Sequence, residues 1–182
     1  TAVLPARLPD YIGRLHDILD SHETKGTFYA HAGAGCLHIR PVINLKDGAQ
    51  VDRMRRIAED VSDLVIEFGG AMSGEHGDGL ARSHLNRKIF GEEIYGAFQK
   101  IKKAFDPQGI MNPGKVVDAP SMTENLRYGA SYGTLDLPTL FSYSEEGGFA
   151  RAVELCNGNG ACRKVGDGTM CPSFMVTLEE EH

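Results

Sequence analysis

The sequence lacks three features that would each place it in a large class of proteins. No apolar run approaches the roughly 20 residues that a membrane-spanning helix needs. Basic residues are not in excess, since the net charge is −6, and this disfavours nucleic-acid binding, which needs a basic face. Residues 1–5 show neither an initiator methionine nor the charged-then-apolar pattern of a signal peptide. We therefore interpret the chain as a piece of a longer protein with no nucleic-acid partner and no transmembrane segment.

Cysteine is scarce and unevenly placed. Cys36 stands alone, whereas Cys156, Cys162 and Cys171 are grouped near the end of the sequence. Without a secretion signal, a reducing compartment is the default, so we expect a cytoplasmic protein. In that setting, grouped cysteines predict a metal or cluster site rather than disulfides.

The 182 residues suffice for one domain with a real core and a smaller appendage. Apolar periodicity predicts two helices and several strands in the first half. Their order is strand, helix, strand, strand, helix, strand, which predicts an α+β fold with a ferredoxin-like antiparallel sheet and helices on one face. The other face remains free to cover a ligand or another domain. The expected elements are residues 1–5, Asp10–His22, Thr27–Ala32, Cys36–Ile43, Asp47–Phe68 and Ala71–Ser73.

The second half is less regular. A further helix is expected at Glu92–Phe105. From Val116 to Ser144 the periodicity disappears, which indicates an extended connector, with disorder as the alternative. We expect a domain over residues 1–118, a connector over 119–150 and a tail over 151–182.

The run SGEHGDG at residues 73–79 places an acid and a histidine among three glycines. Glycine lets the backbone turn tightly and lets another molecule approach closely. Glu75 is a plausible metal ligand and His76 a plausible general base. The alternative is an ordinary surface turn, because Gly-Asp-Gly is common in turns.

A second run, HAGAGCLHIRP at residues 31–41, strengthens the first interpretation. If residues 32–35 form a loop, strand periodicity places His31, His38 and Arg40 on one face of the sheet. Leu37, Ile39 and Val42 then face the core.

An edge strand would bring Glu75 towards the two histidines. Two imidazoles and a carboxylate suit zinc, and also manganese or iron, and leave positions open for a substrate. His31 and His38 could instead be hydrogen-bonded residues of the sheet.

Together with FDPQGIMNPGK at residues 105–115, these runs resemble the C-terminal domain of FAD-linked oxidases of the vanillyl-alcohol oxidase superfamily. Its most similar members are the D-lactate, glycolate and D-2-hydroxyglutarate dehydrogenases. The resemblance covers residues 1–118 and implies that His31, His38 and Glu75 bind a divalent metal while His76 is the catalytic base.

The same resemblance implies that the sheet covers the flavin. Asn112 and Lys115 of the NPGK turn would lie near the isoalloxazine ring as cofactor-binding residues. The FAD would be held mainly by a separate N-terminal domain, so we expect residues 1–182 alone to be inactive.

Two positions depart from the family pattern. Cys36 stands where asparagine is more common, and packing is the role we expect for it. Arg40 replaces a smaller polar residue and could bind a substrate carboxylate through two hydrogen bonds. The alternative for Arg40 is a surface arginine.

The cysteine tail resembles the start of a bacterial ferredoxin motif, C-x2-C-x2-C-x3-C-P. Asn159 stands where the second cysteine belongs, and eight residues separate Cys162 from Cys171. We expect Cys156, Cys162 and Cys171 to hold a 4Fe-4S cluster only when a downstream iron-sulfur domain is present. A zinc site and an unstructured tail are the alternatives.

The leading hypothesis is therefore a flavin-dependent dehydrogenase that oxidises a D-2-hydroxy acid to a 2-keto acid and passes electrons to an iron-sulfur module. Its partners would be the hydroxy acid, an N-terminal FAD-binding domain and the iron-sulfur domain. A metal-dependent hydrolase with His76 as its general base is one alternative. A non-catalytic electron-carrier module is the other.

Overall fold

The structure is a computed structural model that describes residues 1–166 and 172–178. It divides into two units, Thr1–Tyr132 and Gly133–His182, and each is described by itself. Within the described segments, no helix is both long and apolar enough to cross a membrane.

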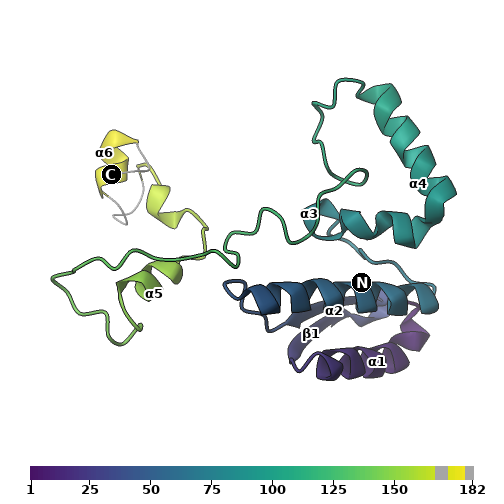
Figure 1. Ribbon diagram of the computed structural model, residues 1–182, viewed down its shortest axis with the longest axis horizontal. Coiled ribbons are helices and arrows are strands. Elements are labelled where there is room, and N and C mark those ends of the chain that lie inside the picture. The colour runs from purple at the N-terminus through teal and green to yellow at the C-terminus, as the bar shows by residue number, and fades with distance from the viewer. Residues whose placement is uncertain (167–171, 179–182) are drawn as a thin grey trace. The chain divides into compact units, whose positions relative to one another are not determined.

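Two helices of the first unit enclose its core, α1 (Leu8–Ser21) and α2 (Gly48–Glu67). Asp47 begins α2 by accepting a hydrogen bond from the Ala49 amide at 2.9 Å, which satisfies one of the free N–H groups at a helix start. The helices pack against each other, and Figure 1 shows them together with the strands. Apolar residues three or four apart face inward; the buried cluster comprises Val3, Leu8, Tyr11, Leu15, Leu19, Leu37, Ile57, Val61, Leu64, Val65 and Phe68.

The sheet is centred on an antiparallel hairpin. Strand β1 (Gly26–His31) pairs with β2 (Cys36–Pro41), and the register places His31 opposite Cys36. A single 3-10 turn, η2 (Ala32–Ala34), joins the strands. The expected hairpin is therefore present. Strand β1 begins and ends one residue earlier than the expected Thr27–Ala32, and β2 ends two residues before the end of the expected Cys36–Ile43.

Two isolated bridges extend this hairpin into a wider sheet. Ala2 pairs antiparallel with Cys36 on one side and with Ala71 on the other. The order across the sheet is thus Ala71, Ala2, β2 and β1. Between Ala2 and α1 the chain forms the 3-10 helix η1 (Pro5–Arg7). This arrangement confirms the predicted α+β class with its ferredoxin-like order. The first and last predicted strands are reduced to single bridges.

Val42 was expected in the core, and that expectation is wrong. Its side chain is 69% exposed. Strand alternation explains the result, because Val42 has the parity of His38 and Arg40, whereas Leu37 and Ile39 face the helices.

From Gly79 to Phe105 the first unit is helical. Helix α3 (Gly79–Arg82) and the 3-10 turn η3 (Ser83–Leu85) precede α4 (Asn86–Phe105). Helix α4 is broken at Gly91, whose φ and ψ of 76° and 169° are not helical, and the change of direction is visible in the teal part of Figure 1. A positive φ is strained for residues with a Cβ, so glycine permits this break. The expected helix at Glu92–Phe105 is the segment after it.

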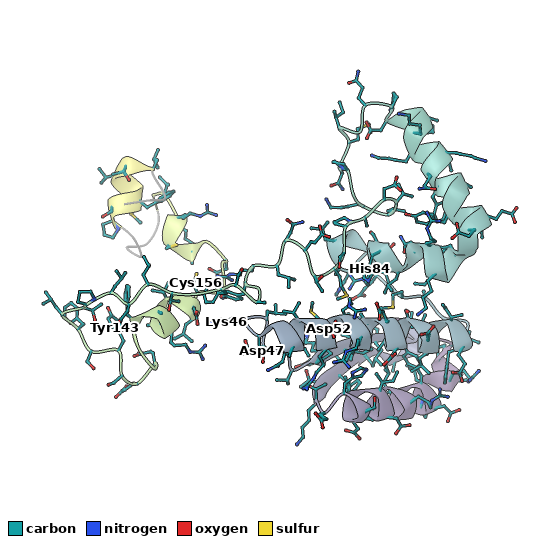
Figure 2. The ribbon with its side chains drawn as sticks, in the orientation of Figure 1. Lys46, Asp47, Asp52, His84, Tyr143 and Cys156 are labelled. Carbon is teal, nitrogen blue, oxygen red and sulfur yellow. The ribbon has the colours of Figure 1, made fainter. Side chains whose placement is uncertain are left out.

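The chain beyond Phe105 remains attached to the first unit for some distance. The ammonium of Lys46 lies over the rings of Tyr128 and Tyr132, at 5.1 and 4.8 Å from their centroids. Lys46 lies beside Asp47 at the start of α2 (Figure 2). These cation–π contacts tie residues up to Tyr132 to the domain.

The second unit has short elements, α5 (Phe149–Glu154), η4 (Ala161–Arg163) and α6 (Pro172–Thr177). The rings of Tyr143 and Phe149 lie 5.3 Å apart. None of its described residues is buried. The described part of this unit therefore has no core of its own comparable to that of the first.

Candidate metal centre

Three predicted ligands lie together on the outer face of the sheet. His31 ends β1, His38 lies in β2, and Glu75 follows the Ala71 bridge. The Nε2 atom of His38 is 3.1 Å from Oε1 of Glu75, and that of His31 is 3.5 Å from Oε2. One ligand atom from each residue lies within 4.8 Å of the others. Such spacing lets a cation enter between the three side chains after small rotations.

Glu75 reaches the histidines because Gly74 crosses closely over β2. A Cβ on Gly74 would lie 2.8 Å from Sγ of Cys36 and 3.2 Å from Cβ of Ala2. Any larger residue would push the loop away from the sheet, and Glu75 with it. Cys36 is buried directly under this crossing, in a position suited to packing.

His76 joins the same group. Its Nε2 is 2.9 Å from Oε1 of Glu75, and its ring centroid is 5.1 Å from that of His38. Three imidazoles thus face one carboxylate, while His76 remains the most exposed of them at 64%. Two histidines and a glutamate fit zinc, manganese or iron. His76 lies close enough to contact a molecule bound beside them.

Arg40 lies on the same face, next to the centre. It lines one pocket of about 350 Å³ together with His38, Glu75 and His76. Its guanidinium carbon is 4.9 Å from the centroid of the Tyr29 ring, a stacking contact that limits how the guanidinium can turn. Tyr29 was not singled out from the sequence. The period-two pattern of β1 could have found it, because Tyr29 stands opposite His38.

The loop that carries Glu75 and His76 is held by polar residues that the sequence did not reveal. Arg82 donates from Nε and Nη2 to the carbonyl of Gly77 at 3.1 and 2.7 Å. Asn86, only 1% exposed, donates to Asp78 at 3.1 Å and to the carbonyl of Val116 at 3.0 Å. The end of the loop is therefore joined to the chain that follows the third motif.

That third motif is a turn organised by Asp106. Its carboxylate accepts hydrogen bonds from the amides of Ile110 and Met111, each at 2.9 Å, and from Lys102 Nζ at 2.6 Å. The hydrogen bond from Lys102 is the main reason that the pKa of Asp106 falls to about 2. Neither Asn112 nor Lys115 lines the pocket of the metal centre. The Lys115 ammonium donates to the carbonyl of Pro113 at 3.3 Å.

The cysteines of the tail belong to the second unit. Cys156, labelled in Figure 2, and Cys162 are exposed. The sulfur of Cys156 accepts a hydrogen bond from the amide of Gly158 at 3.4 Å. Cys171, the third predicted cluster ligand, lies outside the described residues.

The chain is similar to several named dehydrogenases. Proteins named D-2-hydroxyglutarate dehydrogenase from Escherichia coli (strain K12) and Pseudomonas putida are 36% and 38% identical to the whole chain. The chain covers 18% of each, so it spans less than a fifth of these relatives. A D-lactate dehydrogenase from Archaeoglobus fulgidus is 31% identical, over 63% of this chain and 25% of its own length.

The family comparison covers the part of the chain that forms the sheet and the candidate metal centre. Residues 1–116, which are more than half of the sequence, match the family described as FAD linked oxidases, C-terminal domain. The three sequence motifs lie within that match. The chain therefore belongs to the FAD-linked oxidases, as a representative of their C-terminal domain.

Proposed function

We propose that this chain is the substrate-binding part of a FAD-linked dehydrogenase that oxidises a D-2-hydroxy acid to a 2-keto acid. Relatives that match it over 97–100% of its length are named D-2-hydroxyglutarate dehydrogenase, so this acid is the first substrate to test. The observation that carries the proposal is the convergence of His31, His38 and Glu75 within 4.8 Å on the outer face of the sheet.

In this proposal His31, His38 and Glu75 hold a divalent cation. Such a cation supplies a positive charge that orients the hydroxyl and carboxylate oxygens of a 2-hydroxy acid and favours loss of the hydroxyl proton. Glu75 accepts contacts from three imidazoles in the structure. A carboxylate with several such neighbours has its orientation set before a ligand binds, which lowers the entropic cost of ordering the site.

His76 takes the hydroxyl proton. Its Nε2 lies beside Glu75, and its side chain is exposed to whatever occupies the pocket. Imidazole is suited to general-base catalysis near neutral pH.

Arg40 binds a carboxylate of the substrate. It lines the pocket with His38 and His76, and stacking on Tyr29 leaves the edge of the guanidinium available. Two parallel hydrogen bonds from one guanidinium fix the angle of a carboxylate as well as its position. Correct placement of the Cα–H bond accounts for much of the rate in reactions of this kind.

Other parts of the proposal concern groups outside this chain. FAD, the cofactor in the family description, would accept the hydride from Cα. We keep the proposal that Asn112 and Lys115 lie near the flavin and that Cys156, Cys162 and Cys171 join a 4Fe-4S cluster completed by a downstream domain. We also propose the cytoplasm as the compartment, because cysteines that hold a cluster suit a reducing environment.

Flavin reduction tests the function in a protein that carries this chain with its FAD-binding domain. D-2-hydroxyglutarate should bleach the flavin in a stopped-flow experiment. The variant His76→Ala should retain substrate binding but slow bleaching by about 10²–10⁴, the usual range for loss of a general base. The matched control is His16→Ala, since His16 is exposed on α1. Bleaching at the parental rate in His76→Ala would exclude His76 as the base.

A further inference from the structure

The pocket beside the candidate metal centre has polar and apolar walls. His38, Glu75 and His76 line it from the outer face of the sheet, whereas Met54 and Ala58 line it from α2, which packs on the inner face. A 2-hydroxy acid held at the metal centre by its hydroxyl and carboxylate oxygens satisfies the polar wall. The apolar wall is then left to the carbon atoms of the acid beyond C2, since polar groups lose hydration there without a partner.

Met122 also lines this pocket, although it lies outside the three sequence motifs. Its side chain is half-buried. It stands in a turn in which the Glu124 amide donates to the carbonyl of Ser121 at 3.0 Å. The hydroxyl oxygens of Ser121 and Thr123 lie 2.9 Å apart in the same turn. These hydrogen bonds restrict the backbone on both sides of Met122.

The turn belongs to a segment, residues 119–132, that we call the strap. The chain enters the strap from a fixed position beside α4. There the Val116 amide donates to Oγ of Ser83 and the Asp118 amide donates to the hydroxyl of Tyr95, each at 2.9 Å. Ser83 and Tyr95 are both buried. The start of the strap is therefore anchored to η3 and α4.

The other end of the strap is anchored at the start of α2, to which the green trace returns in Figure 1. The Lys46 ammonium lies over the rings of Tyr128 and Tyr132. The backbone of Gly48 lies so close to Ala130 that a Cβ on Gly48 would be 3.1 Å from the Cβ of Ala130. A segment anchored at both ends holds the residue between them against the pocket, which reduces the entropy lost when a ligand binds.

The strap lies outside the domain that the whole family shares. The family match ends at residue 116, before the strap begins. The relatives named D-2-hydroxyglutarate dehydrogenase from Escherichia coli and Pseudomonas putida match the whole chain, and so they match the strap. The metal centre belongs to the shared domain, whereas Met122 stands on an addition to it. A binding residue on such a connecting segment is placed to distinguish one substrate from another.

We propose that Met122 is a specificity-determining residue, which contacts the carbon atoms of the substrate beyond C2 and favours longer 2-hydroxy acids over lactate. This inference rests on the proposed oxidation of a 2-hydroxy acid. Each methylene that leaves water for an apolar wall adds to binding. A methionine side chain is unbranched and adapts its shape. Together with Met54 and Met72, Met122 therefore forms a wall that fits carbon chains of different lengths.

Kinetics in the protein that includes the FAD-binding domain test the contact. Met122→Ala should raise the KM for D-2-hydroxyglutarate about tenfold, because contact with two methylenes is lost, and should leave kcat within about threefold. The KM or inhibition constant of D-lactate, which has one carbon beyond C2, should change by less than about twofold. The matched control is Glu124→Ala, an exposed residue of the same turn outside the pocket. It should equal the parent with both acids.

A second pair of variants tests the strap without touching the pocket. Lys46→Gln removes the cation–π contacts and should raise the KM for D-2-hydroxyglutarate about threefold. Lys46→Arg keeps a cation over the two rings and should restore the parental KM. In Met122→Ala, adding Lys46→Gln should raise the KM no further, since both changes remove the same contact.

The outcomes separate this inference from the proposed function. An unchanged KM for D-2-hydroxyglutarate in Met122→Ala would overturn the inference, as would an equal loss with both acids. An unchanged KM in Lys46→Gln would overturn the role of the strap. Failure of the parent protein to reduce its flavin with any D-2-hydroxy acid would instead reject the proposed function, and the inference with it.

Discussion

The two faces of β2 have opposite characters, although their residues alternate along six positions of one strand. On the inner face Leu37 is 2% exposed, and Ile39 packs against the same core. On the outer face His38 and Arg40 point to the candidate metal centre. One strand therefore contributes to folding through one face and to chemistry through the other, and substitutions should separate the two contributions.

The outer face depends on the inner face for its geometry. The backbones of His31 and His38 belong to the hairpin, whose position is set by the packing of its inner residues on α1 and α2. The reverse dependence is weak for His31 and Arg40, because their side chains are exposed. Changes on the inner face should therefore affect both stability and ligand binding, whereas changes on the outer face should affect binding alone.

The largest expected effect is on the inner face. Leu37→Ala should lower the free energy of unfolding by about 2–5 kcal/mol, since it removes buried methyl groups and leaves a cavity. Urea denaturation followed by circular dichroism measures it. The control Val42→Ala, at an exposed position, should change stability by less than about 0.5 kcal/mol. A Leu37→Ala variant as stable as the parent would contradict the asymmetry of the two faces.

The next effect concerns metal binding on the outer face. Glu75→Gln should weaken zinc binding to this chain by more than about 100-fold, because it removes a ligand rather than an outer partner of one. Calorimetric titration with zinc alone measures the affinity, with Glu93→Gln on exposed α4 surface as the control. The urea midpoint should stay nearly unchanged. Equal zinc affinity in Glu75→Gln and the parent would remove Glu75 from the ligand set.

A smaller effect is expected at Arg40, in the protein that includes the FAD-binding domain. Arg40→Ala should reduce kcat/KM for the hydroxy acid by about 10–100-fold, equal to about 1.5–3 kcal/mol for a charge-assisted hydrogen bond. Arg40→Lys should restore only part, since an ammonium lacks the planar fork. Steady-state kinetics measure kcat/KM for these variants, with Arg56→Ala on α2 as the control. If kcat/KM in both Arg40 variants equals that of the parent, Arg40 is a surface arginine that does not bind the substrate.

The smallest expected effect is on the pH dependence of stability, which differs in origin from the pH dependence of zinc binding at the candidate metal centre. His84 of η3, labelled in Figure 2, has both ring nitrogens buried without a hydrogen-bond partner among the described residues. Burial lowers the pKa of His84. The folded state therefore takes up a proton less readily than the unfolded state, whose histidine titrates near pH 6.5. Stability from this group is complete above that pH and is lost as the pH falls through the lower folded value.

His84→Leu should consequently reduce the loss of stability between pH 7 and pH 5. Urea midpoints at each pH measure this change. Zinc binding should still weaken in acid in the variant, because the imidazole ligands must be neutral to bind. If His84→Leu loses stability in acid as steeply as the parent, other groups are responsible for the sensitivity of the fold.

Local patterns in the sequence determined the helices, the hairpin and the face that the histidines share. The periodicity of Asp47–Phe68 predicted α2 almost residue for residue, because a half-buried helix repeats its apolar residues every three or four positions. The two-residue period of a strand placed His31 and His38 on one face, because successive side chains of a strand point to opposite faces. Read more strictly, that period would also have placed Val42 on the outer face.

Only the tertiary structure decided how distant segments meet. The crossing of Gly74 over Cys36 brings Glu75 to the histidines, and the stacking of Arg40 on Tyr29 positions the guanidinium. Periodicity reports which side of an element is buried. It does not report which element buries it, because that depends on packing between residues that lie far apart in the chain.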